Sequence, residues 1–108
     1  MDLHNATAAK VGLTGRLLLH STSITTIQIG SSNLQDRKWV IIQNQSNANL
    51  AFSFLVSDLT TPTVAHIVKQ GVRLRPGDIV SFPLSENVTL YGCSVSGTGN
   101  AISLSELA

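Results

Sequence analysis

The chain has 108 residues, of which 12% are charged, and it carries a formal net charge of +1 with a sequence pI near 8.0. This length indicates one domain, and a weak net charge without a basic stripe argues against non-specific nucleic-acid binding. The single cysteine, Cys93, cannot form a disulfide within the chain, and no apolar stretch approaches the roughly 18 residues of a membrane-spanning helix. The start of the sequence lacks the basic and apolar regions of a signal peptide, so we expect none.

Residues 1–14 have no clear periodicity, and we expect an N-terminal arm there, followed by one domain at residues 15–108. The rest of the chain consists of short segments rich in Leu, Ile, Val and Thr, separated by turn residues. We predict strands at residues 16–20, 23–29, 37–44, 50–56, 64–68, 72–74, 78–84, 88–95 and 101–107. No window of eleven or more residues has a helical apolar stripe, so we predict a helix-free, all-β fold. The expected architecture is a single antiparallel β-sandwich or jelly-roll-like barrel of about eight strands.

Two segments allow more detailed predictions. The run Trp39-Val40-Ile41-Ile42 is apolar on both faces, which predicts a central strand covered on both sides. Residues 75–78 read Arg-Pro-Gly-Asp, which predicts a type II turn because proline presets φ at the second position and glycine accepts a positive φ at the third.

About a third of the residues are Ser, Thr, Asn or Gln, whereas a typical soluble domain has roughly 25% charged residues. Faces built from neutral polar side chains are easier to desolvate than faces of Lys and Glu, whose burial is costly unless each charge is paired. The composition therefore favours a protein whose surface is covered by copies of itself or by another component of an assembly.

The sequence contains no recognisable catalytic or metal site. His4, His20 and His66 are far apart and have no partner at ligand spacing, so we interpret them as structural. Residues 74–83 are similar to a turn of the cupins, which are metal-binding jelly rolls, but the cupin His-x-His pair is missing. No pair of carboxylates stands out, and Asp36 and Asp78 are interpreted as turn residues. We therefore expect no enzymatic activity, no metal and no cofactor.

The remaining reactive and aromatic side chains are predicted to lie in the core. Cys93 falls within a β pattern, where an apolar setting would raise its pKa and make the thiol inert. Trp39 and Tyr91 also lie in apolar segments that are predicted to be strands. This weakens the case for stacking of sugars, or for binding of single-stranded nucleic acid, on exposed aromatic rings.

Residues 37–44 are similar to an R-x-x-hydrophobic-hydrophobic-I-Q-N strand, and an aromatic strand follows at residues 49–54. A Gly-x-x-Leu-x-Pro-Gly-Asp turn at residues 71–78, a strand at 88–97 and a closing strand with Glu106 complete the pattern. Together these segments resemble small β-sandwich virion proteins of tailed bacteriophages, namely capsid decoration (cement) proteins, head-fibre bases and neck or tail accessory proteins. The resemblance implies an all-β multimer, often a trimer, without enzymatic activity.

The leading hypothesis is a non-enzymatic decoration protein, made in the host cytoplasm, that multimerises on the capsid surface and binds the major capsid protein. Neither nucleic acid nor membrane is an expected partner. The alternatives are a tail, neck or fibre-base adaptor, a carbohydrate-binding module, and a degenerate cupin. The predicted assembly interface consists of Leu3, His4, Val11, Leu13, Arg16, Arg73 and Arg75.

Overall fold

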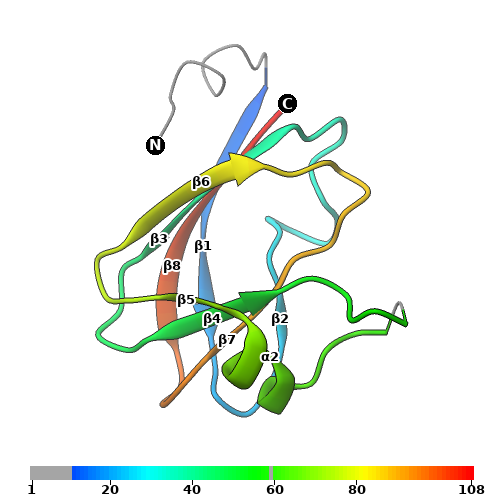
Figure 1. The fold of residues 1–108 in the computed structure, drawn as a ribbon. Coiled ribbons are helices and arrows are strands. Elements are labelled where there is room, and N and C mark those ends of the chain that lie inside the picture. The colour runs from blue at the N-terminus through cyan, green and yellow to red at the C-terminus, as the bar shows by residue number, and fades with distance from the viewer. Residues whose placement is uncertain (1–10, 59) are drawn as a thin grey trace.

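The computed structural model describes residues 11–58 and 60–108, which form an antiparallel β-sandwich of two four-stranded sheets (Figure 1). The first sheet has the strand order β1 (Gly12–Leu19), β8 (Asn100–Leu107), β3 (Trp39–Asn44) and β6 (Ile79–Pro83). The second sheet has the order β2 (Thr25–Thr26), β7 (Tyr91–Ser94), β4 (Leu50–Ser53) and β5 (Val72–Leu74). The predicted all-β sandwich is confirmed.

The pairing of the strands defines a jelly roll. β1 pairs with β8, β2 with β7, β3 with β6, and β4 with β5, always antiparallel. The chain thus forms one long hairpin that is rolled up, so that successive pairs alternate between the two sheets. Viral capsid proteins, lectins and cupins share this architecture, so the topology alone assigns no function.

The largest differences from the predicted strand boundaries are in the first two strands. β1 begins at Gly12, so residues 12–14 belong to the sheet and not to an arm. Residues 1–10 of the predicted arm lie outside the described residues. β2 is much shorter than predicted, because after Thr26 the chain turns and the Gln28 amide donates back to the Thr26 carbonyl (3.1 Å).

The prediction of a helix-free chain with a strand at residues 64–68 is wrong, because α2 (Val64–Gln70) occupies this segment. Its N-cap is Thr63, whose Oγ1 accepts a hydrogen bond from the His66 amide (3.1 Å) and so satisfies one unpaired helical donor. Buried Ile67 lies with Cys93 in a small apolar cluster on the outer face of the second sheet. Within residues 11–58 and 60–108, no helix is long and apolar enough to cross a membrane.

The main core lies between the two sheets. Its buried members, which come from both sheets and from the connecting loops, are Leu19, Ile27, Val40, Ile42, Leu50, Phe52, Leu74, Leu84, Leu90, Ile102 and Leu104. β3 is central, as predicted, but it is not covered on both sides. Val40 and Ile42 point into the core, while Trp39 and Ile41 lie on the outer face and are half-buried.

The predicted turn at residues 75–78 is consistent with the structure. Gly77 has a φ of +83°, which a side chain would disfavour, and the Asp78 amide donates to the Arg75 carbonyl (3.0 Å). The Asp78 carboxylate accepts a further hydrogen bond from the Arg75 amide (2.9 Å). This turn carries the chain from β5 in the second sheet to β6 in the first.

Candidate interaction surfaces

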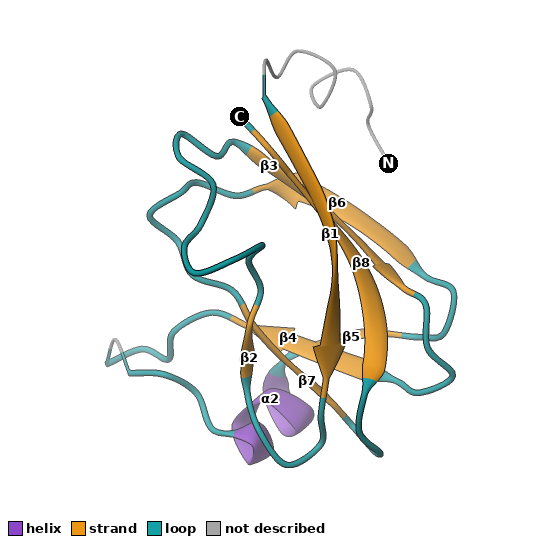
Figure 2. Cartoon of the chain, turned by 180° about the vertical axis from the view of Figure 1, so that it is seen from behind, coloured by secondary structure: helices purple, strands orange, loops and turns teal. Residues whose placement is uncertain are grey.

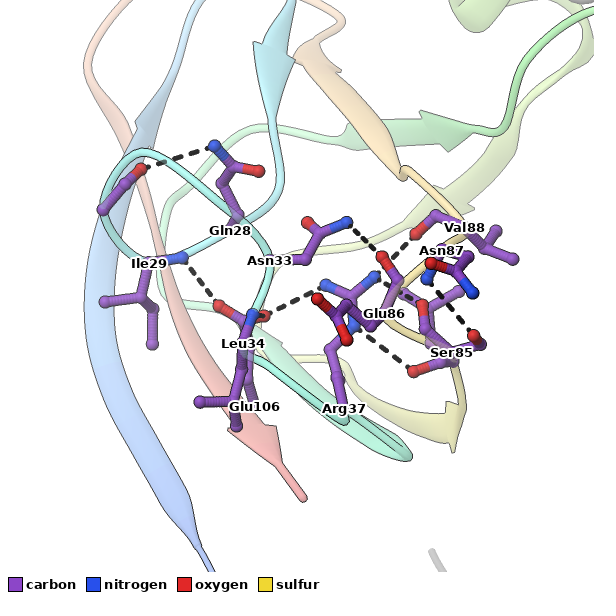
Figure 3. A network of polar contacts seen from close by, with 12 residues as sticks. Gln28, Ile29, Asn33, Leu34, Arg37, Ser85, Glu86, Asn87, Val88 and Glu106 are labelled. Atoms are coloured by element: carbon purple, nitrogen blue, oxygen red, sulfur yellow. Dashed lines mark hydrogen bonds and ion pairs between the residues drawn. The ribbon is translucent and has the colours of Figure 1, made fainter.

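A buried ion pair lies at the end of β8 (Figure 3). Arg37 Nη1 is 3.0 Å from Glu106 Oε2, and both side chains are fully buried. Glu106 also accepts backbone hydrogen bonds from Ile29 (2.7 Å) and Leu34 (3.0 Å). The carboxylate therefore holds the long connection between β2 and β3 against the inner face of the first sheet.

The other donors of the Arg37 guanidinium form hydrogen bonds with the loop between β6 and β7. Nε donates to the Leu84 carbonyl (3.2 Å), and Nη2 donates to the carbonyls of Ser85 (3.0 Å) and Val88 (2.6 Å). Burial of two charges is tolerated only where their mutual attraction is supplemented by further hydrogen bonds, as it is here. The pair is a structural connection between two loops and one strand.

Asn44, at the end of β3, has a similar role. Its buried side chain donates to the carbonyls of Ala48 (2.8 Å) and Leu74 (2.9 Å) and accepts from the amide (2.9 Å) and hydroxyl (2.7 Å) of Ser46. The first and last residues of the segment at 37–44 are thus both buried polar groups that hold loops in place. This part of the sequence pattern therefore reflects the requirements of the fold.

The candidate chemical groups of the sequence lie apart where the structure describes them. Among residues 11–58 and 60–108, no three His, Cys, Asp or Glu side chains are grouped so that they could hold a metal ion. His20 Nδ1 accepts a hydrogen bond from the Gly99 amide (3.0 Å), and the backbone of His66 belongs to the N-cap of α2. Burial raises the pKa of the Cys93 thiol, as predicted, and hydrogen bonding by the Thr60 hydroxyl lowers the pKa of the exposed Asp58 carboxyl.

The outer face of the first sheet is almost free of charge. Strand register and alternation place on it residues from all four strands, and Arg16 is the only charged residue among them. These residues are Gly12, Thr14, Arg16, Leu18, Trp39, Ile41, Gln43, Ile79, Ser81, Pro83, Ala101, Ser103, Ser105 and Leu107. α2 lies against the second sheet and away from this face (Figure 2). We call it the uncharged face.

Trp39 lies on the uncharged face and not in the core where it was predicted. Within the described part of the chain, its Nε1 and the Ser81 Oγ are buried polar atoms without a hydrogen-bond partner. Buried indole N–H groups usually have an acceptor. Tyr91, by contrast, packs against the cluster under α2, which fits its predicted buried role more closely.

An apolar groove of about 620 Å³ opens between the edges of β5 and β6. Its floor belongs to the main core and includes Phe52 and Leu90. Its rim carries three exposed large apolar side chains, namely Val72 (72% exposed), Ile79 (53%) and Phe54 (46%). Among the described strands, β5 pairs only with β4, and β6 only with β3, so each has one unpaired edge at this opening. We call it the β5–β6 groove.

A second, polar hollow of about 470 Å³ lies near the buried ion pair. It is lined by Ser32, Asn33, Gln35, Asp36, Glu86 and Asn87. In this hollow, Glu86 Oε1 accepts a hydrogen bond from the Asp36 amide (2.8 Å), and the Asn33 side-chain amide donates to the Glu86 carbonyl (2.8 Å). Asp36 has a φ of 59°, which agrees with its interpretation as a turn residue.

The predicted interface residues fall in two separate places. Val11 (55% exposed) and Leu13 (41%) are at the start of β1, and Arg16 lies further along this strand. Arg73 lies in β5, where its Nη2 donates to the Val68 carbonyl (2.8 Å), and exposed Arg75 lies in the turn that follows. Leu3 and His4 lie outside the described residues.

The comparisons with known proteins agree with the fold class. No protein-family model matches this sequence, and no curated protein sequence matches it. The structure is similar to that of protein NMB1881 from Neisseria meningitidis, with a TM-score of 0.50 and 14% identity over 90% of this chain and 74% of that chain. At this identity the similarity shows a shared fold only.

Two further solved structures align more weakly, with TM-scores below 0.5. The coat protein of Tobacco streak virus aligns with a TM-score of 0.44 and 9% identity over 91% of this chain and 85% of that chain. A protein of Bacillus endospore appendages, described as disulfide-linked pili, aligns with a TM-score of 0.43 and 8% identity over 89% and 88% of the two chains. The strand pairing alone defines the class of this protein as the jelly-roll β-sandwich.

Proposed function

We propose that this protein is a non-enzymatic structural subunit of a virion, a capsid decoration protein of a tailed bacteriophage that binds the major capsid protein. The observation that carries the proposal is the uncharged face of the first sheet, with one charged residue on four strands. The resemblance of residues 37–107 to small virion proteins of tailed bacteriophages supports a place on the virion, and the choice of the capsid surface is part of the proposal.

The physical argument concerns the cost of covering a sheet. A solvated antiparallel sheet usually presents a polar outer face, and each Lys or Glu on it must be paired or dehydrated when a partner docks. On the uncharged face, Ser, Thr and Gln side chains lie beside Trp39, Ile41 and Leu18, and the hydroxyls of Thr14 and Ser105 are hydrogen-bonded to each other (3.0 Å). Such a face can be covered at little electrostatic cost.

Docking across neighbouring capsid subunits would stabilise the shell by linkage. A protein that binds the assembled shell and not its free subunits shifts the equilibrium toward the assembled state. A homotrimer would present three copies of the uncharged face at once and raise the overall affinity through multivalency. The protein acts in this proposal by binding alone.

The test is co-sedimentation of purified protein with capsids that lack it. Gln43→Glu introduces one negative charge within the uncharged face, and Gln35→Glu introduces the same charge in the exposed connection between β2 and β3, outside this face. We expect Gln43→Glu to weaken capsid binding at least about tenfold, because a buried charge without a partner is costly, and Gln35→Glu to bind normally. Equal binding by both variants would exclude this face as the contact surface.

The number of copies per particle distinguishes the proposed decoration role from a tail, neck or fibre-base adaptor. Quantitative mass spectrometry of purified virions should find hundreds of copies for a decoration protein, against about a dozen or fewer for a neck ring. Absence of the protein from virions, together with specific binding on a glycan array, would instead support the carbohydrate-binding alternative.

A further inference from the structure

We propose that the β5–β6 groove binds the N-terminal segment, residues 1–10, of a second copy of this chain. This inference rests on the proposed structural role and specifies how the subunits associate. The segment of one copy would lie as an added strand along the unpaired edge of β5 or β6 in the next copy.

The groove has the features of a site for an extended peptide. It is bounded on both sides by unpaired strand edges, which offer backbone donors and acceptors for strand addition. Between these edges, alternate side chains of a guest strand would reach the floor at Phe52 and Leu90, which belong to the main core. The apolar rim at Val72 and Ile79 is exposed in the single copy and would be covered in the complex.

The N-terminal segment has the composition that this groove requires. It reads MDLHNATAAK, so its only Asp, Glu, Lys or Arg residues are Asp2 and Lys10 near its two ends. Ten extended residues reach at most about 33–36 Å, which is about twice the length of the five-residue β6. The segment also continues directly into Val11 and Leu13, two exposed apolar residues at the start of β1.

The positions of the N-terminal segment and of the groove favour binding of the segment to a second copy over binding within its own chain. β1 and β6 are the opposite edges of the first sheet, with β8 and β3 between them. The start of β1 is held on its own edge by reciprocal backbone bonds between Val11 and Ala108 (2.9 and 2.7 Å). A segment that leaves one edge and a groove at the other make a head-to-tail contact, which generates a ring or a filament when repeated.

This arrangement gives four of the predicted interface residues one common contact. Leu3 and His4 belong to the donated segment and Val11 adjoins it, while Arg73 lines the groove that receives it. Leu13 follows within β1. Arg16 and Arg75 lie outside both the segment and the groove lining.

The test uses two complementary variants of the full protein. Deletion of residues 1–10 removes the donor and keeps the groove, and Val72→Glu places a charge on the groove rim and keeps the donor. Val88→Glu is the matched control, because Val88 is also an exposed valine (40%) but lies outside the groove. Ile79→Glu is a second groove variant, and circular dichroism checks that each variant is folded.

Sedimentation equilibrium should show an oligomer for the wild-type chain and for Val88→Glu, and a monomer for the deletion and for both groove variants. A mixture of the deletion and Val72→Glu should form a 1:1 dimer and nothing larger, because only one donor and one intact groove can meet. A mixture without this dimer overturns the inference, as does a wild-type monomer. If the wild-type chain and both groove variants form the same oligomer, the N-terminal segment does not bind the β5–β6 groove. Capsid binding by the wild-type protein, measured separately, would still support the proposed function in that case.

Discussion

Substitution of Glu106 by glutamine removes one buried charge with almost no change in side-chain shape. Three donors converge on the carboxylate: the Ile29 amide on Oε1, and the Leu34 amide and Arg37 Nη1 on Oε2. A glutamine amide has one acceptor oxygen and one NH2 group, so in either orientation an NH2 group faces at least one of these donors. Arg37 would also remain as a buried cation without a counter-charge.

Loss of one partner of a buried ion pair costs about 3–5 kcal/mol, which is a large fraction of the roughly 5–15 kcal/mol that stabilises a domain of this kind. For a chain of this length, about 4 °C of Tm corresponds to each kcal/mol, so Glu106→Gln should lower the Tm by about 12–20 °C. Thermal unfolding followed by circular dichroism and denaturant titration of the free energy of unfolding measure the change independently.

Glu86→Gln is the matched control. This carboxylate is partly exposed and accepts one hydrogen bond, from the Asp36 amide (2.8 Å), so its substitution should cost less than about 1 kcal/mol. If Glu106→Gln costs no more than Glu86→Gln, then the buried ion pair shown in Figure 3 does not hold the two loops in place.

Further predictions follow from close contacts and burial. Gly71→Ala should lower the free energy of unfolding by about 1–3 kcal/mol in denaturant titration, because a Cβ atom at this position would lie 2.5 Å from the backbone oxygens of Ile67 and Phe52; unchanged stability would mean that the end of α2 shifts freely. The Cys93 thiol should resist alkylation in the folded protein and react on unfolding, and rapid labelling under native conditions would contradict its burial. Since the pKa of Cys93 is raised on folding above the ordinary value of 9.0, the unfolded chain binds fewer protons above that pH, so stability should fall as pH rises past it, and fall less steeply in Cys93→Ala. Arg37→Met combined with Glu106→Leu should remain destabilised, although apolar replacement of a buried pair is often neutral, because backbone groups of both loops lose their partners; a neutral double variant would show that water replaces them.

Local patterns predicted most strands, because side-chain alternation depends only on neighbouring residues. β5 was predicted with its observed boundaries, and β3, β6 and β8 were predicted within about two residues at each end. α2 was missed because it is only seven residues long and rich in β-branched residues, which favour strands. Its available signals were Thr63 as an N-cap and the apolar spacing of Val64, Ile67 and Val68.

The buried ion pair had one local signal that was not used. Glu106 is in the same strand phase as Ile102 and Leu104, so alternation alone places its carboxylate on the core side and requires a partner. The identity of that partner depends on the packing of Arg37, which is 69 residues away. Sequence periodicity does not encode such a contact.

The two candidate surfaces differ in how far composition could predict them. The low charge content indicated a surface that is easily covered, but only strand register shows that neutral residues gather on one face of the first sheet. The β5–β6 groove depends on which strands are edge strands, and this follows from the rolled topology. No local pattern at Val72 or Ile79 identifies them as the rim of one groove.

The position of the last strand has a consequence for how the protein is made. β8 comes after β1 and β3 in the chain, yet it lies in the interior of the first sheet, where it pairs with β1 on one side and β3 on the other. During translation, β1 and β3 therefore have no neighbour between them until β8 has been synthesised. A chain truncated before β8 would expose two long strand edges and be a substrate for aggregation or proteolysis.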